Sequence, residues 1–189
     1  MAGNGSGDAA ADGVAAGGGP APGPSTLSFL ENGIDQIAFV VEDLEATVES
    51  YRRTFGIGGW VFHTYAAPLL SYMTYHGHPA EYSMRLALSY FGPNRVELIE
   101  PLEGPSVYHD FVEKHGYGVQ HFGIVVPGME RALSEARAAG IDVLMEGAGF
   151  GLDGDGHFAY LDTEDAFGVT YELIERPARR VEPEKTYPG

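Results

Sequence analysis

Four polar side chains lie in segments that otherwise resemble buried strands, and together they suit a divalent metal ion. The four are Gln36, Glu97, His121 and Glu172. Glu97 and Glu172 each begin the tetrapeptide Glu-Leu-Ile-Glu, so both carboxylates have large apolar neighbours in the chain. A carboxylate is costly to bury in such a setting unless it is paired or binds a cation. Two carboxylates balance the charge of one divalent ion, and an imidazole and an amide can complete its ligands.

The donor types narrow the choice of metal. A set rich in oxygen with one imidazole favours Mg, Mn, Co, Fe or Ni over a structural Zn site, although Zn stays among the candidates. The chain has no Cys, which excludes a thiolate zinc site, a disulfide and a Cys nucleophile. Any one of the four residues alone is more commonly an ordinary surface side chain, so the prediction of one divalent ion depends on the set.

The same four residues stand at matching positions of an internal repeat. Ile34–Val41 aligns without a gap on Val119–Val126, which places Gln36 on His121. The two Glu-Leu-Ile-Glu segments form a second echo, one after each copy. Two copies indicate a duplicated module and not a solenoid.

Each copy is predicted to fold as β-α-β-β-β. In the first copy, residues 34–41 alternate between two faces, and Asp43 is a candidate N-cap for a helix that runs through Phe55. The helix of each copy should cover the apolar face of its sheet and leave the polar set on the other face. Further strands are predicted over residues 60–65, 84–91 and 95–100 in the first copy, and over 121–126, 141–145, 157–161 and 169–175 in the second, which has its helix over 129–139.

The remaining segments fall outside the repeat. Residues 66–83 have no counterpart in the second copy and are predicted to pass over one face, while residues 101–118 link the copies and contain a short helix near 106–114. Residues 1–26 are rich in Gly, Ala and Pro with almost no large apolar side chain, which predicts a disordered tail. Residues 178–189 are predicted to form a loose C-terminal tail.

These motifs resemble the vicinal oxygen chelate superfamily, the glyoxalase, bleomycin-resistance and extradiol-dioxygenase group. Within it, the chain is most similar to the methylmalonyl-CoA epimerase-like branch. The resemblance covers residues 33–177, with modules of about 33–101 and 119–177. It implies an α+β fold in which two βαβββ modules form an open funnel-like barrel around a metal that binds two neighbouring oxygens of a substrate. The segments that carry it are Ile34–Ala38 with Glu42-Asp43-Leu44, Val96–Pro101, His115-Gly116 before Gln120–Gly123, and Gly168–Leu173.

The resemblance assigns the metal ligands to the same four residues, Gln36, Glu97, His121 and Glu172, with two departures from the family pattern. Gln36 stands where the family usually has His, so the two-His, one-carboxylate iron site of the dioxygenases is incomplete. Arg85 aligns where the epimerase branch places a catalytic Glu, and an Arg cannot act as a base at neutral pH. Family members are commonly dimers, so a homodimer is expected.

The first functional hypothesis is a metal-dependent enzyme that polarises a carbonyl of a small-molecule substrate for proton transfer. Glu172 and Glu97 are the candidate catalytic carboxylates, and the reaction is an isomerisation or epimerisation, or glyoxalase-like lyase chemistry. The alternative is a metal-free protein that binds a small molecule or sequesters a drug, of the bleomycin-resistance kind. Retention of Glu97, His121 and Glu172 favours the enzyme, whereas Gln36 and Arg85 favour the binding protein.

The candidate substrate-binding residues are Arg85, Trp60, Tyr65 and Tyr75. Alternation along its strand predicts that Arg85 points into the funnel and binds a carboxylate or phosphate; the alternative is an ion pair with Glu97 or another acid. Trp60 and Tyr65 are predicted to line an apolar pocket, with a place in the core as the alternative. Tyr75, in the 66–83 excursion, belongs either to a lid or to an exposed polar loop.

The composition limits the partners and the compartment. A net charge of −16 argues against binding to a nucleic-acid backbone, which requires clustered Lys and Arg. No apolar run is long enough to span a bilayer, so no membrane partner is expected. The N-terminus lacks the basic and continuous apolar regions of a secretory signal, so a cytoplasmic protein is expected.

Overall fold

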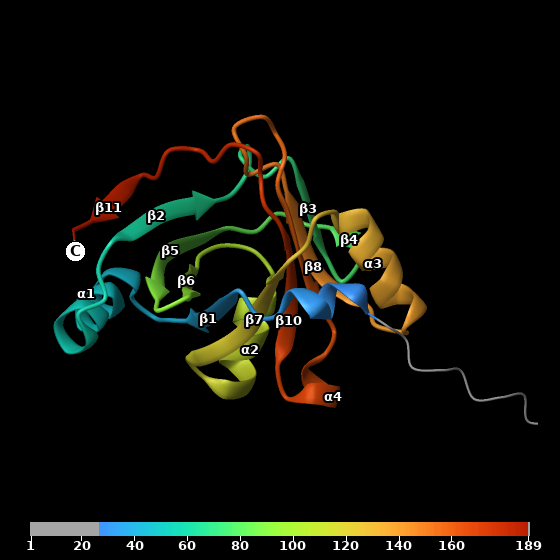
Figure 1. The fold of residues 1–189 in the computed structure, drawn as a ribbon, viewed down its shortest axis with the longest axis horizontal. Coiled ribbons are helices and arrows are strands. Elements are labelled where there is room, and N and C mark those ends of the chain that lie inside the picture. The colour runs from blue at the N-terminus through green and yellow to red at the C-terminus, as the bar shows by residue number, and fades with distance from the viewer. Residues whose placement is uncertain (1–26, 189) are drawn as a thin grey trace, which may run out of the picture.

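The computed structural model describes residues 27–188, and the tail predicted over 1–26 lies outside the described residues. Within this range the fold is α+β, as predicted, with one open 11-stranded sheet (Figure 1). The strands are β1 (Gln36–Val40), β2 (Trp60–Tyr65), β3 (Tyr72–Tyr75), β4 (His78–Pro79), β5 (Met84–Phe91), β6 (Asn94–Pro101), β7 (Gly118–Val125), β8 (Val143–Ala148), β9 (His157–Leu161), β10 (Thr170–Glu175) and β11 (Lys185–Tyr187). The helices are α1 (Leu44–Phe55), α2 (Val107–His115), α3 (Met129–Ala138), α4 (Glu164–Phe167) and the 3-10 helix η1 (Ser28–Asn32).

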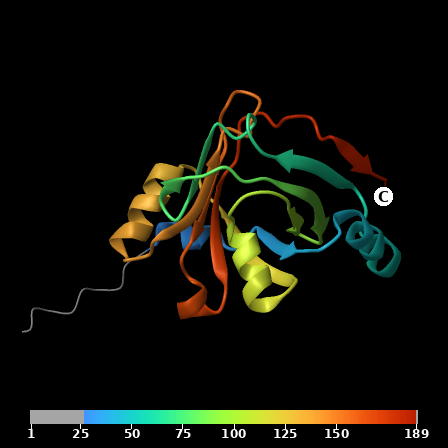
Figure 2. The same ribbon diagram turned by 180° about the vertical axis from the view of Figure 1, so that it is seen from behind.

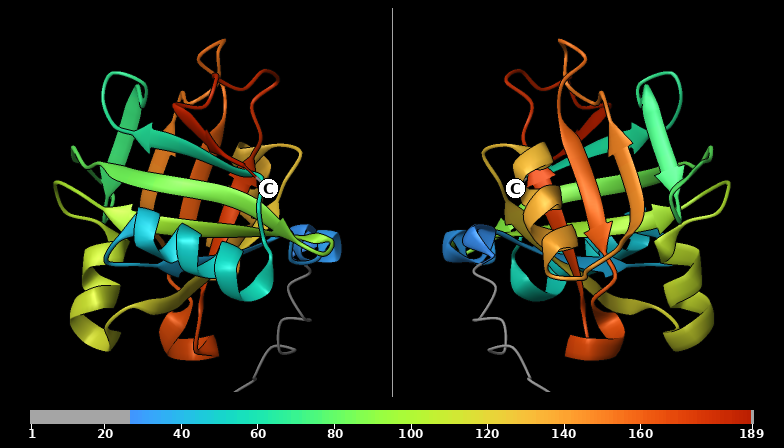
Figure 3. Two further views of the ribbon diagram at one scale, coloured as in Figure 1. Left: turned by 90° about the vertical axis from the view of Figure 1, so that its left-hand side faces the viewer. Right: turned by 90° about the vertical axis from the view of Figure 1, so that its right-hand side faces the viewer.

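The strand order shows the duplication. Across the sheet it is β11-β2-β5-β6-β1-β7-β10-β9-β8-β3-β4. The first module comprises β1, α1, β2, β5 and β6, and the second comprises β7, α3, β8, β9 and β10. In each module the first strand pairs in parallel with the last, and β1 pairs antiparallel with β7 to join the modules. Figure 3 shows the strands of one module crossing those of the other, so the sheet curves around a concave face.

Each module carries its helix on the convex face (Figure 3). The side chain of Asp43 accepts a hydrogen bond from the Ala46 amide at 2.8 Å, so Asp43 is the N-cap of α1 as predicted. Gly56 ends the helix in the left-handed conformation, which glycine adopts without strain. Leu44 and Val48 of α1 pack into the core of the first module, and α3 packs in the same way on the second. Among the described residues, no helix is long and apolar enough to cross a membrane.

Two segments leave their own module and add strands to the edge of the other. Residues 66–83 follow β2 of the first module and form β3 and β4, and β3 pairs with β8 of the second module. Part of this segment also lies over the concave face, where Leu70 and Tyr82 are buried. After β10, the chain returns to the first module and forms β11, which pairs with β2. This pairing differs from the loose tail predicted over 178–189, because the edge strand β2 offers backbone groups that β11 can pair with.

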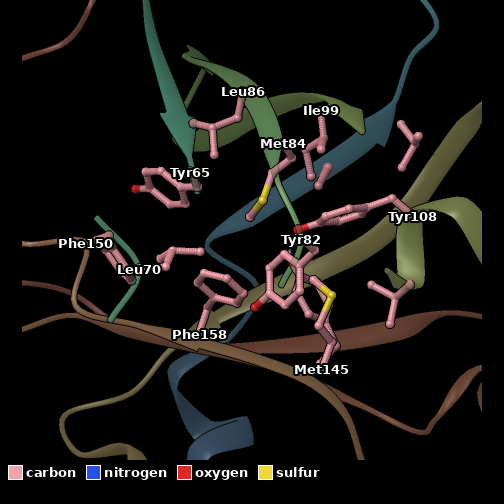
Figure 4. Packing of buried hydrophobic residues seen from close by; sticks show 14 of the residues in the cluster. Tyr65, Leu70, Tyr82, Met84, Leu86, Ile99, Tyr108, Met145, Phe150 and Phe158 are labelled. Carbon is pink, nitrogen blue, oxygen red and sulfur yellow. Dashed lines mark hydrogen bonds between the residues drawn. The ribbon is translucent and has the colours of Figure 1, made fainter. Parts of the chain in front are cut away.

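A hydrophobic cluster, called the interior cluster here, fills much of the concave face. Figure 4 shows Tyr65, Phe150 and Phe158 on one side of it and Tyr82 and Met145 on another. Helix α2, predicted near 106–114, lies at the lower end between the modules (Figure 2) and contributes the buried side chains of its first turn. Burial of a large apolar side chain contributes about 1.5–3 kcal/mol, so this cluster holds the two modules together around the polar residues beside it.

Candidate functional site

The central strands bring the four predicted ligands into one buried group, called the four-residue cluster from here on. Gln36 lies on β1, Glu97 on β6, His121 on β7 and Glu172 on β10, with exposed fractions of 1%, 7%, 0% and 4%. The strand register explains why these side chains lie close together, since both Glu97 and His121 are paired with Ala38 on β1. The four positions that the repeat singled out therefore share one face of the sheet.

Gly123 lets the first and last strands of the cluster approach each other. It lies opposite Gln36 in the β1–β7 pair and beside Glu172 in the β7–β10 pair. A Cβ at this position would lie 2.9 Å from Gln36 Cβ, 2.8 Å from Ile174 Cδ1 and 3.3 Å from Glu172 Oε2. The absence of a side chain at Gly123 is therefore a steric condition for the cluster.

The side-chain atoms of the cluster converge on the amide of Gln36. Its Nε2 donates to Glu97 Oε2 at 2.8 Å and to Glu172 Oε2 at 3.1 Å, and lies 3.3 Å from His121 Nε2. His121 Nε2 is 3.1 Å from Glu172 Oε2 and 3.6 Å from Glu97 Oε2. The ligand atoms of the two carboxylates and the imidazole all lie within 4.8 Å of one another. This spacing allows one ion to contact all three.

A β-bulge on β7 orients the imidazole. Ala38 pairs with His121 and Phe39 with Val119, so Gln120 is the extra residue between them. The bulge lets the buried Gln120 Oε1 lie 2.6 Å from His121 Nδ1, which donates the hydrogen bond because Oε1 can only accept. His121 Nε2 then carries the lone pair of the neutral ring and faces the carboxylates, as a metal ligand requires. Gln120 was not among the predicted site residues, since strand alternation places it on the other face.

The charges in the cluster favour a cation. Burial lowers the pKa of His121, but Glu172 and Glu97 outweigh burial and raise it to about 9. Among the described residues, neither carboxylate forms an ion pair with Lys or Arg. Two buried carboxylates are thus balanced only by one imidazole. A divalent ion would neutralise both, and rotation of the Gln36 amide would present its oxygen where Nε2 lies, so the donor set fits a metal.

Two tyrosines that the sequence did not single out form the wall beside the cluster. Tyr160 on β9 lies directly opposite Glu172, and its ring meets that of His121 edge to face at 5.0 Å between centroids. Its hydroxyl is 2.7 Å from the hydroxyl of Tyr108 on α2. Burial, with the nearby carboxylates, raises the pKa of both phenols well above the usual value, so both stay neutral. Tyr160 could have been predicted from the sequence, because alternation along its strand places it on the face of the cluster. Tyr108 could not, because only the packing of α2 brings it there.

Arg85 lies on the convex face, away from the cluster. Leu88 is directly opposite Glu97 in the antiparallel β5–β6 pair, so Leu88 shares the concave face with Glu97 and Arg85 does not. Arg85 donates instead to Glu45 of α1, at 2.7 and 3.1 Å. The prediction that Arg85 points into the funnel is therefore wrong. Alternation defined two faces of β5, but the pairing with β6 decides which one faces the cluster.

The three aromatic candidates for substrate binding lie in different places. Trp60 is fully buried beneath α1 and donates to the Ile57 carbonyl at 3.0 Å, so it belongs to the core and lines no pocket at the cluster. Tyr65 lies on the concave face and stacks on Phe150 at 5.2 Å between ring centroids. Tyr75 lies on β3, where its hydroxyl donates to Asp110 of α2 at 2.6 Å. Of the three, Tyr65 agrees best with the prediction, because it lies on the same concave face as the cluster.

Comparison with known sequences identifies one family. A sequence profile described as the Glyoxalase/Bleomycin resistance protein/Dioxygenase superfamily matches residues 35–160. This range includes both first strands of the repeat and three of the four cluster residues. No curated relative matches the chain at a significant level.

Solved structures of methylmalonyl-CoA epimerase share the fold. A variant of the Streptomyces coelicolor enzyme in complex with 2-nitronate-propionyl-CoA is 29% identical with a TM-score of 0.56, over 78% of this chain and 96% of that one. The enzyme from Mycobacterium tuberculosis is 26% identical with a TM-score of 0.55, over 77% and 88% of the two chains. An epimerase in complex with methylmalonyl-CoA and NH4+ is 28% identical with a TM-score of 0.52, over 78% and 96%. The resemblance to the epimerase-like branch is therefore confirmed.

Proposed function

The chain belongs to the glyoxalase/bleomycin resistance protein/dioxygenase superfamily, and from this premise we propose that it is a metal-dependent enzyme that moves a proton next to a substrate carbonyl. The observation that carries the proposal is the four-residue cluster, in which two buried carboxylates face one imidazole without a Lys or Arg partner in the described chain. Isomerisation or epimerisation is the first candidate reaction, and glyoxalase-like lyase chemistry is the second.

Each residue of the cluster has a defined role in this proposal. Glu97, His121 and Glu172 would hold the metal, and Gln36 would complete the set through its amide oxygen after the amide rotates. When bound, a divalent ion would act as a Lewis acid on a substrate carbonyl. Gln120 keeps the imidazole lone pair turned toward the cluster, because its Oε1 accepts the hydrogen bond from the Nδ1–H group.

Proton transfer falls to the carboxylates. Each has a second oxygen besides the Oε2 that meets Gln36, and this oxygen can take a proton from the carbon beside the carbonyl and return it. Arg85 provides no base, since it is paired with Glu45 on the far face of the sheet. Glu172 and Glu97 are therefore the proton carriers that the concave face offers, with the neutral phenols of Tyr108 and Tyr160 behind them.

The related structures suggest the substrate to try first. They are methylmalonyl-CoA epimerases, two of them in complex with CoA thioesters. We propose a thioester that bears a removable hydrogen on the carbon next to its carbonyl. The homodimer and the cytoplasmic location stay predictions.

Hydrogen exchange with solvent tests the proposal. Methylmalonyl-CoA incubated with metal-loaded protein in deuterated water should lose its carbon-bound hydrogen, as followed by NMR. The exchange should stop after chelation and should fall by about 10²–10⁴-fold in Glu172→Gln, because glutamine keeps an oxygen ligand but cannot accept the proton. Exchange that continues unchanged after chelation and in this variant would contradict the proposal.

One observation favours a second candidate, a metal-free protein that binds small molecules. The Gln36 amide donates to both carboxylates and so satisfies the cluster without an ion. Such a protein would bind its ligand equally well with and without metal and would catalyse no exchange. The same experiment, repeated with binding of the ligand measured by calorimetry, separates the two candidates.

A further inference from the structure

Unlike Arg85, Arg95 lies on the concave face, and its charge is left largely unpaired. Arg95 and Glu97 are two residues apart on β6, so both side chains leave the same face of the strand. Arg95 is only 6% exposed. Its nearest carboxylate in the described chain is that of Asp35, 3.9 Å from Nη2, and its buried Nε has no hydrogen-bond partner. A buried guanidinium with an unsatisfied donor is unfavourable, so the Nε of Arg95 favours a hydrogen-bond acceptor beside it.

Arg95 lines a pocket that the C-terminal segment helps to form. The pocket has a volume of about 340 Å³ and lies between β2, β5, β6 and the segment that leads to β11. Its size is within the range of pockets that hold small ligands. The polar side chains that line it include His63 and Arg180, together with the exposed carboxylate of Glu182; its apolar wall includes Val61 and Leu88.

Arg180 adds a second cationic group to the same pocket. Within the described residues it has no carboxylate within 4.0 Å, while Arg176 and Arg179 beside it are both paired with aspartates. Although Arg180 is exposed as a whole residue, partial burial of its guanidinium, followed by the charge of Arg95, lowers its pKa. The chain has only 11 Lys and Arg against 27 Asp and Glu. Arg180 is exposed and can be solvated by water, whereas the buried Nε of Arg95 cannot, so an anion in the pocket would satisfy Arg95 and also contact Arg180.

We propose that Arg95 and Arg180 form a binding subsite for the anionic group, a carboxylate or a phosphate, of a small ligand that enters this pocket. The guanidinium fork suits both groups because each presents two oxygens to it. Arg95 and Glu97 are two residues apart on one strand, so their Cα atoms are roughly 7 Å apart and the subsite lies on the same face as the cluster. With the proposed function, the ligand is an acyl compound that carries an anionic group in addition to its carbonyl. Only this link to the reacting carbonyl rests on the proposed function; the anion subsite stands on its own.

Titration of metal-free protein tests the subsite apart from catalysis. Chelated protein is titrated with inorganic phosphate and, separately, with malonate, at constant ionic strength maintained with chloride, and binding is followed by calorimetry and by Tm. We expect saturable binding of at least one anion, which tells whether phosphate or carboxylate is preferred. Arg95→Met and Arg180→Gln should each weaken it by about tenfold to a hundredfold. Without anion, Arg95→Met should not lower Tm, because it removes the unsatisfied donor and leaves an apolar side chain.

Arg85→Met is the matched control, since Arg85 lies on the neighbouring strand but on the opposite face. It should leave anion affinity unchanged. No saturable binding of either anion, or equal affinities in Arg95→Met, Arg180→Gln and Arg85→Met, would overturn the subsite. Titration of the same samples with metal alone reports on the proposed function separately, so the failure of one does not imply the failure of the other.

Discussion

The two modules have the same strands and the same acidic position, yet their concave faces differ. Glu97 and Glu172 match each other in the repeat, but Leu88 lies opposite the first and Tyr160 opposite the second. Two residues earlier on the same strand faces, the first module has Arg95 and the second has Thr170. Both modules contribute to the interior cluster, the second with Phe158 and Tyr160 and the first mainly with aliphatic side chains such as Leu86, and the first also borders the 340 Å³ pocket.

The four-residue cluster follows the symmetry of the repeat, whereas the side chains around it differ between the modules. The duplicated strands supply equivalent positions around one point, which suits an ion with several ligands. A substrate has no such symmetry and needs one open side and one closed side. The second module is the closed wall, through Tyr160 and its hydroxyl partner Tyr108. The first module borders the pocket that the crossing C-terminal segment completes, and we expect a substrate to enter from this side.

The largest effect is expected from pH on metal affinity. Of the matching residues Gln36 and His121, only His121 gains or loses a proton. Without metal, His121 is protonated below its pKa of about 9, and a metal must displace that proton. Apparent metal affinity should therefore rise about tenfold per pH unit, or about a hundredfold from pH 6 to pH 8. Calorimetric titration of chelated protein measures this slope.

A Gln36→His variant sharpens the test, because it gives the first module the residue of the second. Two imidazoles then have to lose protons, so the rise with pH should be steeper than in the native protein. A native affinity that does not change between pH 6 and pH 8 would show that His121 does not bind the metal.

A smaller effect is expected from Gly123→Ala, which tests the close approach of the two modules at the cluster. The added Cβ would meet Gln36 Cβ and Ile174 Cδ1 at less than 3 Å. Overpacking of this kind costs about 1–3 kcal/mol, or a Tm lower by roughly 2–4 °C per kcal/mol, and metal affinity should fall with it. Gly118→Ala on the same strand is the control, since nothing lies within 4 Å of its Cβ. Equal Tm values for the two variants would contradict the steric account of the cluster.

The smallest effect is expected at the N-terminus, where the chain docks on the second module. Phe29 of η1 is buried against α3, and the Ser28 hydroxyl donates to Glu135 at 2.8 Å. A protein that begins at Leu27 should keep the Tm of the full chain, because residues 1–26 contain almost no large apolar side chain to bury. A protein that begins at Gly33 loses the burial of Phe29 and should melt several degrees lower. A drop already present in the first truncation would show that residues 1–26 pack.

The sequence predicted the modules and the cluster because both depend on a repeated pattern. Gln36, Glu97, His121 and Glu172 could be found by aligning the chain with itself, and alternation along each strand placed them on one face. What it could not predict depends on register and on contacts between distant segments. Both faces of β5 are buried, so the pattern did not show that Arg85 faces α1. Gln120 joins the site only through a bulge, and β3 and β11 pair with strands of the other module.

Arg95 illustrates a signal that was present and not used. It stands two residues before Glu97, so the period of two that placed Glu97 on the concave face also places Arg95 there. Arg180, by contrast, comes after the repeat, and only the pairing of β11 with β2 brings its segment to the pocket. The proposed anion subsite is therefore less visible in the sequence than the four-residue cluster.

The measurement that tests the central claim most directly is the metal content of protein purified without a histidine tag, after chelation and refilling. The account predicts one divalent ion per chain, bound saturably, with the ion lost in His121→Ala because the cluster then has no imidazole. Control spectra by circular dichroism should show that the variant keeps its fold. Substoichiometric metal that is the same in the native protein and in His121→Ala would contradict the metal site and favour the metal-free binding protein.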